Sequence, residues 1–135
     1  MKRFNLDSHM TAFIGGAFYP TGHSMIMFPS LEVASRIGHQ LIEDDVVSGD
    51  EIYLISPEEI LAQITPTTKG HDYPLPSAGT EGNAVANYTR LAREGHAALL
   101  IKTRDEAAAE KVMAVVRQVP YSTAERYRRL VIEDL

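Results

Sequence analysis

The sequence contains no cysteine, and this absence removes several kinds of site at once. Disulfide bridges, thiolate zinc sites, cysteine nucleophiles and iron–sulfur clusters all require the missing sulfur atom. A single domain of 135 residues needs none of these cross-links, because it can bury about two-thirds of the surface that its unfolded chain exposes. A chain without cysteine is compatible with a reducing cytosol, and we expect a cytoplasmic protein.

Excess positive charge and long apolar runs are missing as well. Lys and Arg number 13 against 18 Asp and Glu, which gives a formal net charge of −5. Proteins that hold a phosphate backbone usually carry a basic face, so we expect no nucleic-acid partner. No apolar run approaches the ~20 residues that cross a bilayer, so we expect no membrane partner either.

The first ten residues lack the apolar segment of a secretory signal peptide. Within them, Ser8-His9-Met10 resembles the remnant of a cloning site. We therefore expect residues 1–10 to be a disordered leader or a tag remnant. Residues 11–135 have the length and composition of a single α/β domain.

Two strand–helix–strand units of nearly equal length follow each other along the chain. In the first unit, the apolar strand 25–28 precedes a helix that Ser30 caps, and the strand 51–55 follows. The second unit has the apolar strand 97–101, a helix capped by Thr103, and a last strand at 127–132.

This duplication predicts an α/β fold of the α+β sandwich type, a ferredoxin-like duplicated βαβ with an extra helical and loop insertion between the repeats. In that topology the first strand of each unit is central, and these are the two strands that are apolar on both faces.

One face of such a sheet is covered by the helices of the two units, and the other face needs a separate cover. The expected cover is the middle segment, with helices near 57–64 and 83–94, together with a second subunit. We therefore expect a homodimer, which is also the most frequent oligomer.

Sites for a metal or a cofactor have no support in the sequence. No two of the five histidines stand at helical i, i+4 spacing, and no P-loop or Gly-x-Ser-x-Gly motif is present. We expect no metal and no cofactor.

The turn at residues 19–24 is the first candidate site. Tyr19 and His23 could line a ligand pocket at the end of the sheet. The alternative is a tight turn in which both side chains form local hydrogen bonds, and this is the more frequent situation.

The irregular stretch 65–82 is the second candidate, because long loops inside compact domains are often functional. His71 beside Asp72 could act as an acid–base pair with Tyr73 nearby, and Thr80 begins a helix whose free amides could bind an anion. The equally supported alternative is a rigid proline-rich connector that crosses the open face of the sheet.

Arginines 126, 128 and 129 surround the expected last strand. Contact with RNA is one interpretation, but the expected central strands lack the aromatic residues on which RNA-binding sheets stack bases. Charges that protect an edge strand from aggregation are the preferred interpretation.

Three segments resemble a family of small uncharacterised bacterial proteins: 19–23 (YPTGH), 79–81 (GTE) and 127–135 (YRRLVIEDL). The βαβ order is also loosely similar to that of ferredoxin-like small stress-induced bacterial proteins. Neither resemblance implies an assigned activity or a catalytic residue.

The leading hypothesis is a non-catalytic cytosolic module, dimeric, that binds a small ligand or a protein partner. One alternative is a small enzyme whose acid–base site combines His23, His71 and Asp72. The other is a structural stress-related protein.

Overall fold

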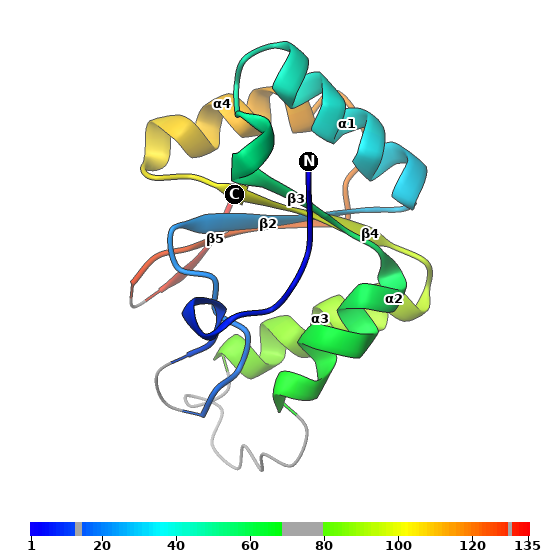
Figure 1. Ribbon diagram of the computed structural model, residues 1–135, viewed down its shortest axis with the longest axis vertical. Coiled ribbons are helices and arrows are strands. Elements are labelled where there is room, and N and C mark those ends of the chain that lie inside the picture. Colours follow the sequence, from blue (N-terminus) through cyan, green and yellow to red (C-terminus); the bar gives the residue numbers. More distant parts are fainter. Residues whose placement is uncertain (13–14, 69–79, 130) are drawn as a thin grey trace.

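The computed structural model describes residues 1–12, 15–68, 80–129 and 131–135, and for residues 80 and 81 it describes the backbone alone. A six-stranded sheet forms its centre (Figure 1). The strands are β1 (Lys2–Arg3), β2 (His23–Phe28), β3 (Ile52–Ile55), β4 (Ala97–Lys102), β5 (Thr123–Tyr127) and β6 (Ile132–Asp134). The α-helices are α1 (Leu31–Glu43), α2 (Pro57–Glu59), α3 (Thr80–Arg93) and α4 (Glu106–Val116). The shorter turns are the 3-10 helices η1 (Ser8–Met10), η2 (Gly49–Glu51) and η4 (Thr65–Thr68) and the π-helix η3 (Ile60–Ile64).

The strand order is β1-β3-β4-β2-β5-β6, with β2 and β4 in the middle. Every neighbouring pair is antiparallel except β1 and β3, which run parallel. The central position of the first strand of each unit is thus confirmed, as is a mixed α/β fold. β2 and β4 can lie there because both are almost entirely apolar and have helices above and below.

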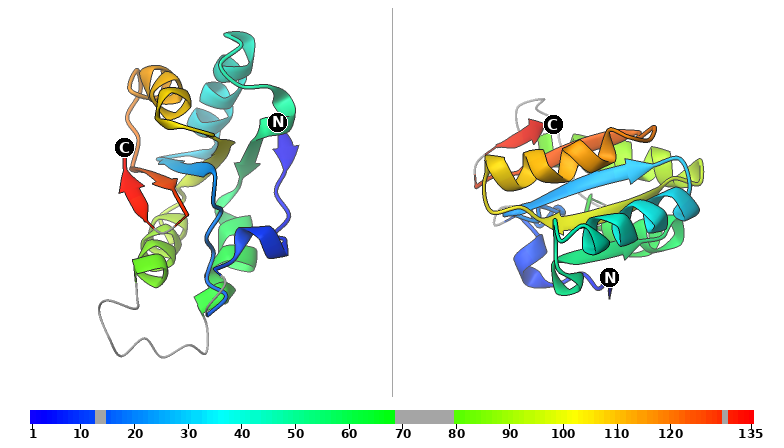
Figure 2. Two further views of the ribbon diagram at one scale, coloured as in Figure 1. Left: turned by 90° about the vertical axis from the view of Figure 1, so that its left-hand side faces the viewer. Right: turned by 90° about the horizontal axis from the view of Figure 1, so that it is seen from above.

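Helices cover both faces of the sheet (Figures 1 and 2). α1 and α4 lie side by side on one face, where they pack on Ile26 and Phe28 of β2. Met25 and Met27, which alternate with them, point to the other face and pack with η3 and α3. The expected cover from the middle segment is therefore confirmed, and none of the described helices is long and apolar enough to span a bilayer.

The middle segment leaves little apolar surface for a second subunit to cover. Among the described residues, the large hydrophobic side chains classed as exposed are Leu31, Tyr121 and Val131. Because the uncovered face was the main reason to expect a homodimer, that reason disappears, and the dimer stays a prediction.

The expected helix cap at Ser30 is present, and Ser56 caps the short helix α2. Ser30 Oγ accepts a hydrogen bond from Val33 N at 3.2 Å, and Ser56 forms a reciprocal capping box with Glu59. The expected cap at Thr103 is wrong: α4 begins later, and Asp105 caps it by accepting a hydrogen bond from Ala108 N. Thr103 is instead buried.

The expected last strand at 127–132 is also wrong. β5 ends at Tyr127, the chain turns, and β6 begins at Ile132. Arg128 N donates to Val131 O at 2.9 Å across this turn. The strand β5 was missed because each of its faces carries a charged side chain, Glu125 on one and Arg126 on the other, so it has no apolar run.

The N-terminal segment packs against the sheet, so residues 1–10 are not disordered, and their interpretation as a tag remnant stays a prediction. Lys2 pairs with Tyr53 in the register of β1 and β3. Phe4 is only 1% exposed, and its ring meets those of Phe18 and Tyr53 edge to face at 6.3 and 6.0 Å. Buried aromatic area of this kind stabilises the attachment of the segment.

Candidate functional site

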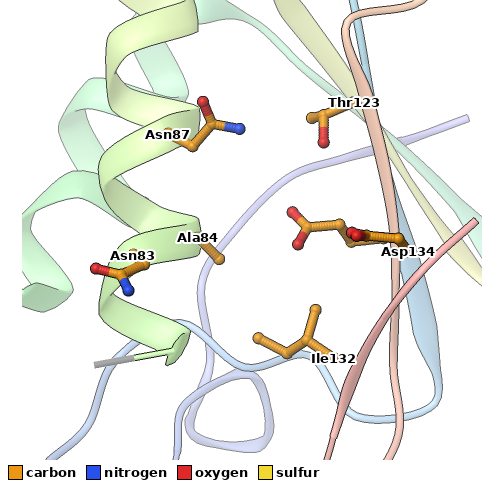
Figure 3. A pocket seen from close by; sticks show the side chains of 7 residues that line it. Asn83, Ala84, Asn87, Thr123, Ile132 and Asp134 are labelled. Carbon is orange, nitrogen blue, oxygen red and sulfur yellow. The ribbon is translucent and has the colours of Figure 1, made fainter. Parts of the chain in front are cut away.

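A pocket of about 380 Å³ opens between α3 and the β5–β6 hairpin (Figure 3). Small-ligand pockets commonly have volumes of about 300–1,000 Å³, so this one has room for a small molecule. We call it the α3–β5–β6 pocket, and it is lined by Asn83, Ala84, Asn87, Thr123, Glu125, Ile132 and Asp134.

Helical and strand periodicity bring these side chains together. Asn83 and Asn87 are four residues apart on α3 and therefore share one side of the helix. Thr123 and Glu125 are two residues apart on β5, so their side chains share one face of the strand. Glu125 lies directly opposite Asp134 in the antiparallel register of β5 and β6. The pocket wall thus combines two carboxyl groups with amide and hydroxyl groups.

A chain of hydrogen bonds leads from the pocket into the core. The Tyr88 hydroxyl donates to Glu125 Oε1 at 2.9 Å and lies 2.8 Å from the Tyr127 hydroxyl. Because a phenol has a single proton, Tyr127 is the donor in the second bond when Tyr88 donates to Glu125. Tyr88 and Tyr127 are 0% and 1% exposed. Two buried tyrosines therefore hold the Glu125 carboxyl in a fixed orientation.

Burial changes the pKa values of two groups in this chain of hydrogen bonds, Glu125 and Tyr88. It is the main cause that raises the pKa of Glu125 above its ordinary value; the hydrogen bond from Tyr88 opposes the shift and the charge of Asp134 adds to it. Burial also raises the pKa of the Tyr88 hydroxyl well above its usual value, with further contributions from Tyr127 and Glu125. Tyr88 consequently stays a hydrogen-bond donor, while Glu125 keeps its proton to a higher pH than an exposed glutamate.

Two residues predicted from the sequence as site residues have partners outside the α3–β5–β6 pocket. The Tyr19 hydroxyl donates to Arg128 O at 2.5 Å, and the Tyr19 ring packs on the Tyr127 ring at 4.9 Å. His23 Nδ1 lies 3.1 Å from Thr21 O. Neither side chain lines the α3–β5–β6 pocket. The His23 contact is local, as the tight-turn interpretation expects, whereas the Tyr19 hydroxyl bonds to a residue 109 positions further along the chain.

His71, Asp72 and Tyr73 lie outside the described residues. Thr80 is the first residue of α3, and its side chain is outside them too. The geometry of a combined site of His23, His71 and Asp72 is therefore not part of the structure described here.

The sequence reasoning missed every residue that lines the pocket. It assigned the helix near 83–94 to the cover of one face of the sheet and gave Asn83 no part in a binding site. The spacing of Asn83 and Asn87 and the alternation Thr123, Glu125, Tyr127 were the available indications, but helix and strand meet only in the folded chain.

Within the described part of the chain, no group of three His, Cys, Asp or Glu side chains is placed to hold a metal ion. The pocket supplies two carboxyl groups, Glu125 and Asp134. Comparisons with protein-family models, with curated proteins and with solved structures found no significant match to this chain.

Proposed function

We propose that this chain is a non-catalytic module that binds a small molecule in the α3–β5–β6 pocket. The observation that carries the proposal is the support behind Glu125: a carboxyl group at the pocket wall is fixed by the buried pair Tyr88 and Tyr127. Binding sites work best when their polar groups are held in place before the ligand arrives, because less rotamer freedom is then lost on binding.

The proposal includes a ferredoxin-like core made of β2, α1, β3, β4, α4 and β5. The order β3-β4-β2-β5, the antiparallel neighbours and the two helices on one face support it. In this description β1, β6 and the middle segment are additions, and two of these additions, α3 and β6, build the pocket. The family resemblance, the bacterial source and the cytoplasmic location stay predictions.

The test is a screen of small amines, carboxylic acids, sugars and nucleotides by thermal shift, followed by amide chemical-shift mapping. A ligand at about 100 times its Kd stabilises the folded state by about 2.7 kcal/mol, which a melting curve detects. We expect the amides that shift to lie on α3, β5 and β6.

Two tryptophan variants provide the matched comparison. Asn83 is exposed and lines the pocket, so Asn83→Trp fills the entrance, whereas Ala86 is exposed on the same helix and does not line it. We expect Asn83→Trp to abolish the thermal shift and Ala86→Trp to preserve it. A ligand that binds both variants equally, or a library without any ligand, would refute the proposal.

A further inference from the structure

The two carboxyl groups of the α3–β5–β6 pocket, Glu125 and Asp134, differ in their ion pairing from Glu133, the third acidic residue of the hairpin. Glu133 lies 3.7 Å from an Arg126 nitrogen and 3.6 Å from an Arg128 nitrogen. Among the described residues, no Lys, Arg or His forms an ion pair with Glu125 or Asp134. The hairpin thus neutralises Glu133 and leaves the pair that faces the pocket without a cation.

Charged groups on the neighbouring elements do not replace that cation. On α3, the Arg90 guanidinium is occupied by Asn87 Oδ1 at 2.7 Å and Glu94 Oε2 at 3.2 Å. On α4, Glu106, Glu110 and Arg117 border a second cavity that Asp134 also lines, and Arg117 already pairs with Glu110 at 2.6 Å. Tyr88 and Tyr127 contribute neutral hydroxyls.

The pocket has the parts that an ammonium group on an aliphatic stem requires. An ammonium has three N–H donors, and the carboxyl groups of Glu125 and Asp134 and the hydroxyl of Thr123 are acceptors on one wall. Figure 3 shows Thr123 and Asp134 opposite α3, with Ile132 and Ala84 as apolar neighbours for a methylene stem.

We propose that the pocket binds an alkylammonium ion, which takes the place of a proton held by the Glu125–Asp134 pair. The inference rests on the proposed function, because it needs the α3–β5–β6 pocket to be the ligand site. In the step, one carboxyl O–H bond breaks, the proton passes to the solvent, and the ammonium stays intact between the two carboxylates. Glu125 is half-buried opposite its register partner Asp134, which disfavours its ionised form, and the entering cation removes this penalty.

An alkylammonium group has two sources, a free diamine or the lysine side chain of a protein partner. Cadaverine represents the first, and Nα-acetyl-lysine amide represents the second. Pentanol has the same kind of stem without the charge and serves as the neutral control. Tighter binding of cadaverine assigns the pocket to free polyamines, and tighter binding of the lysine derivative assigns it to a partner's lysine.

The experiment is calorimetric titration in buffers of different ionisation enthalpy, from about pH 4.5 to about pH 8, a range that begins near ordinary carboxyl pKa values. We expect proton release to fall from about one per ligand towards zero as the pH rises, since the pair is then already ionised. Glu125→Gln should end proton release and weaken binding about tenfold or more. Glu133→Gln, the control on the same hairpin, should change neither.

The outcomes separate this inference from the proposed function. Amine binding without proton release at every pH, equal binding by Glu125→Gln, or binding of Mg²⁺ or Ca²⁺ instead of amines would overturn the inference. If neutral or anionic ligands bind in a way that Asn83→Trp blocks while cadaverine does not bind, the inference fails and the proposed function stands. If no probe binds the unmodified protein, both fail.

Discussion

Replacing Tyr88 by Phe removes one buried oxygen and leaves the ring, so it tests the hydrogen-bond chain behind the pocket directly. The hydroxyl donates to Glu125 Oε1 at 2.9 Å and lies 2.8 Å from the Tyr127 hydroxyl. A hydrogen bond to a charged group contributes about 1.5–3 kcal/mol and a neutral one about 0.5–1.5 kcal/mol. We therefore expect Tyr88→Phe to lower the free energy of unfolding by about 2–4 kcal/mol near pH 7.

Urea unfolding followed by circular dichroism measures this loss, with an unchanged m-value as evidence that the variant unfolds like the parent. Tyr53→Phe is the matched control, because no hydrogen bond of the Tyr53 hydroxyl is found among the described residues. It should change stability by less than about 0.5 kcal/mol. A Tyr88→Phe loss as small as that of the control would refute the idea that buried tyrosines hold Glu125.

Three further predictions concern titration, the N-terminal segment and a helix cap. Because its folded-state pKa is raised, Glu125 binds more protons in the folded than in the unfolded state, so its contribution to stability falls as the pH rises from the ordinary glutamate value through the raised one. Glu125→Gln should remove this slope in urea unfolding measured across pH, and a difference between the two proteins that does not vary with pH would contradict it. Phe4→Ala should cost about 3–5 kcal/mol, since the side chain is 1% exposed, and a loss below about 1 kcal/mol would show that the N-terminal segment is not packed. Ser56→Ala should cost about 1 kcal/mol in the same assay through the lost capping box, and Ser56→Asp should keep most of that stability.

The centre of the fold was predictable because it depends on strong local patterns. A strand whose side chains are apolar on both faces has to lie in the middle of a covered sheet, and β2 and β4 do. Ser30 and Ser56 were predictable as caps since a hydroxyl ahead of a helical apolar pattern has a specific local function. The apolar pattern of each strand is visible locally although its partner strand is distant, and each cap bond joins residues three positions apart.

The errors fall where distant contacts decide. Thr103 looked like a cap, but its hydroxyl instead lies 2.8 Å from that of Ser24 inside the sheet. The aromatic side chain of the N-terminal segment is Phe4, and its partners Phe18 and Tyr53 are far along the chain. The sequence of β5 looks polar because it contains Glu125, whose carboxyl accepts a hydrogen bond from Tyr88, 37 residues earlier.

The position of the pocket follows from the same packing argument. β2 and β4 have no polar side chain to offer over most of their length, because both of their faces are buried. One strand further out, β5 points Ala124 at the α4 face and Glu125 and Tyr127 at α3. A carboxyl can be half-buried there only if the helix opposite supplies a donor, and Tyr88 does so while the shorter Asn83 and Asn87 leave space beside it. On α3, the buried Tyr88 therefore marks the sealed part of this interface, and Asn83 and Asn87 mark the part that is open to a ligand. Asn87→Tyr should close the open part by filling the pocket, and amide chemical-shift mapping with cadaverine should then show no perturbation on β5 and β6. Persistent shifts there would place the binding site elsewhere on the hairpin.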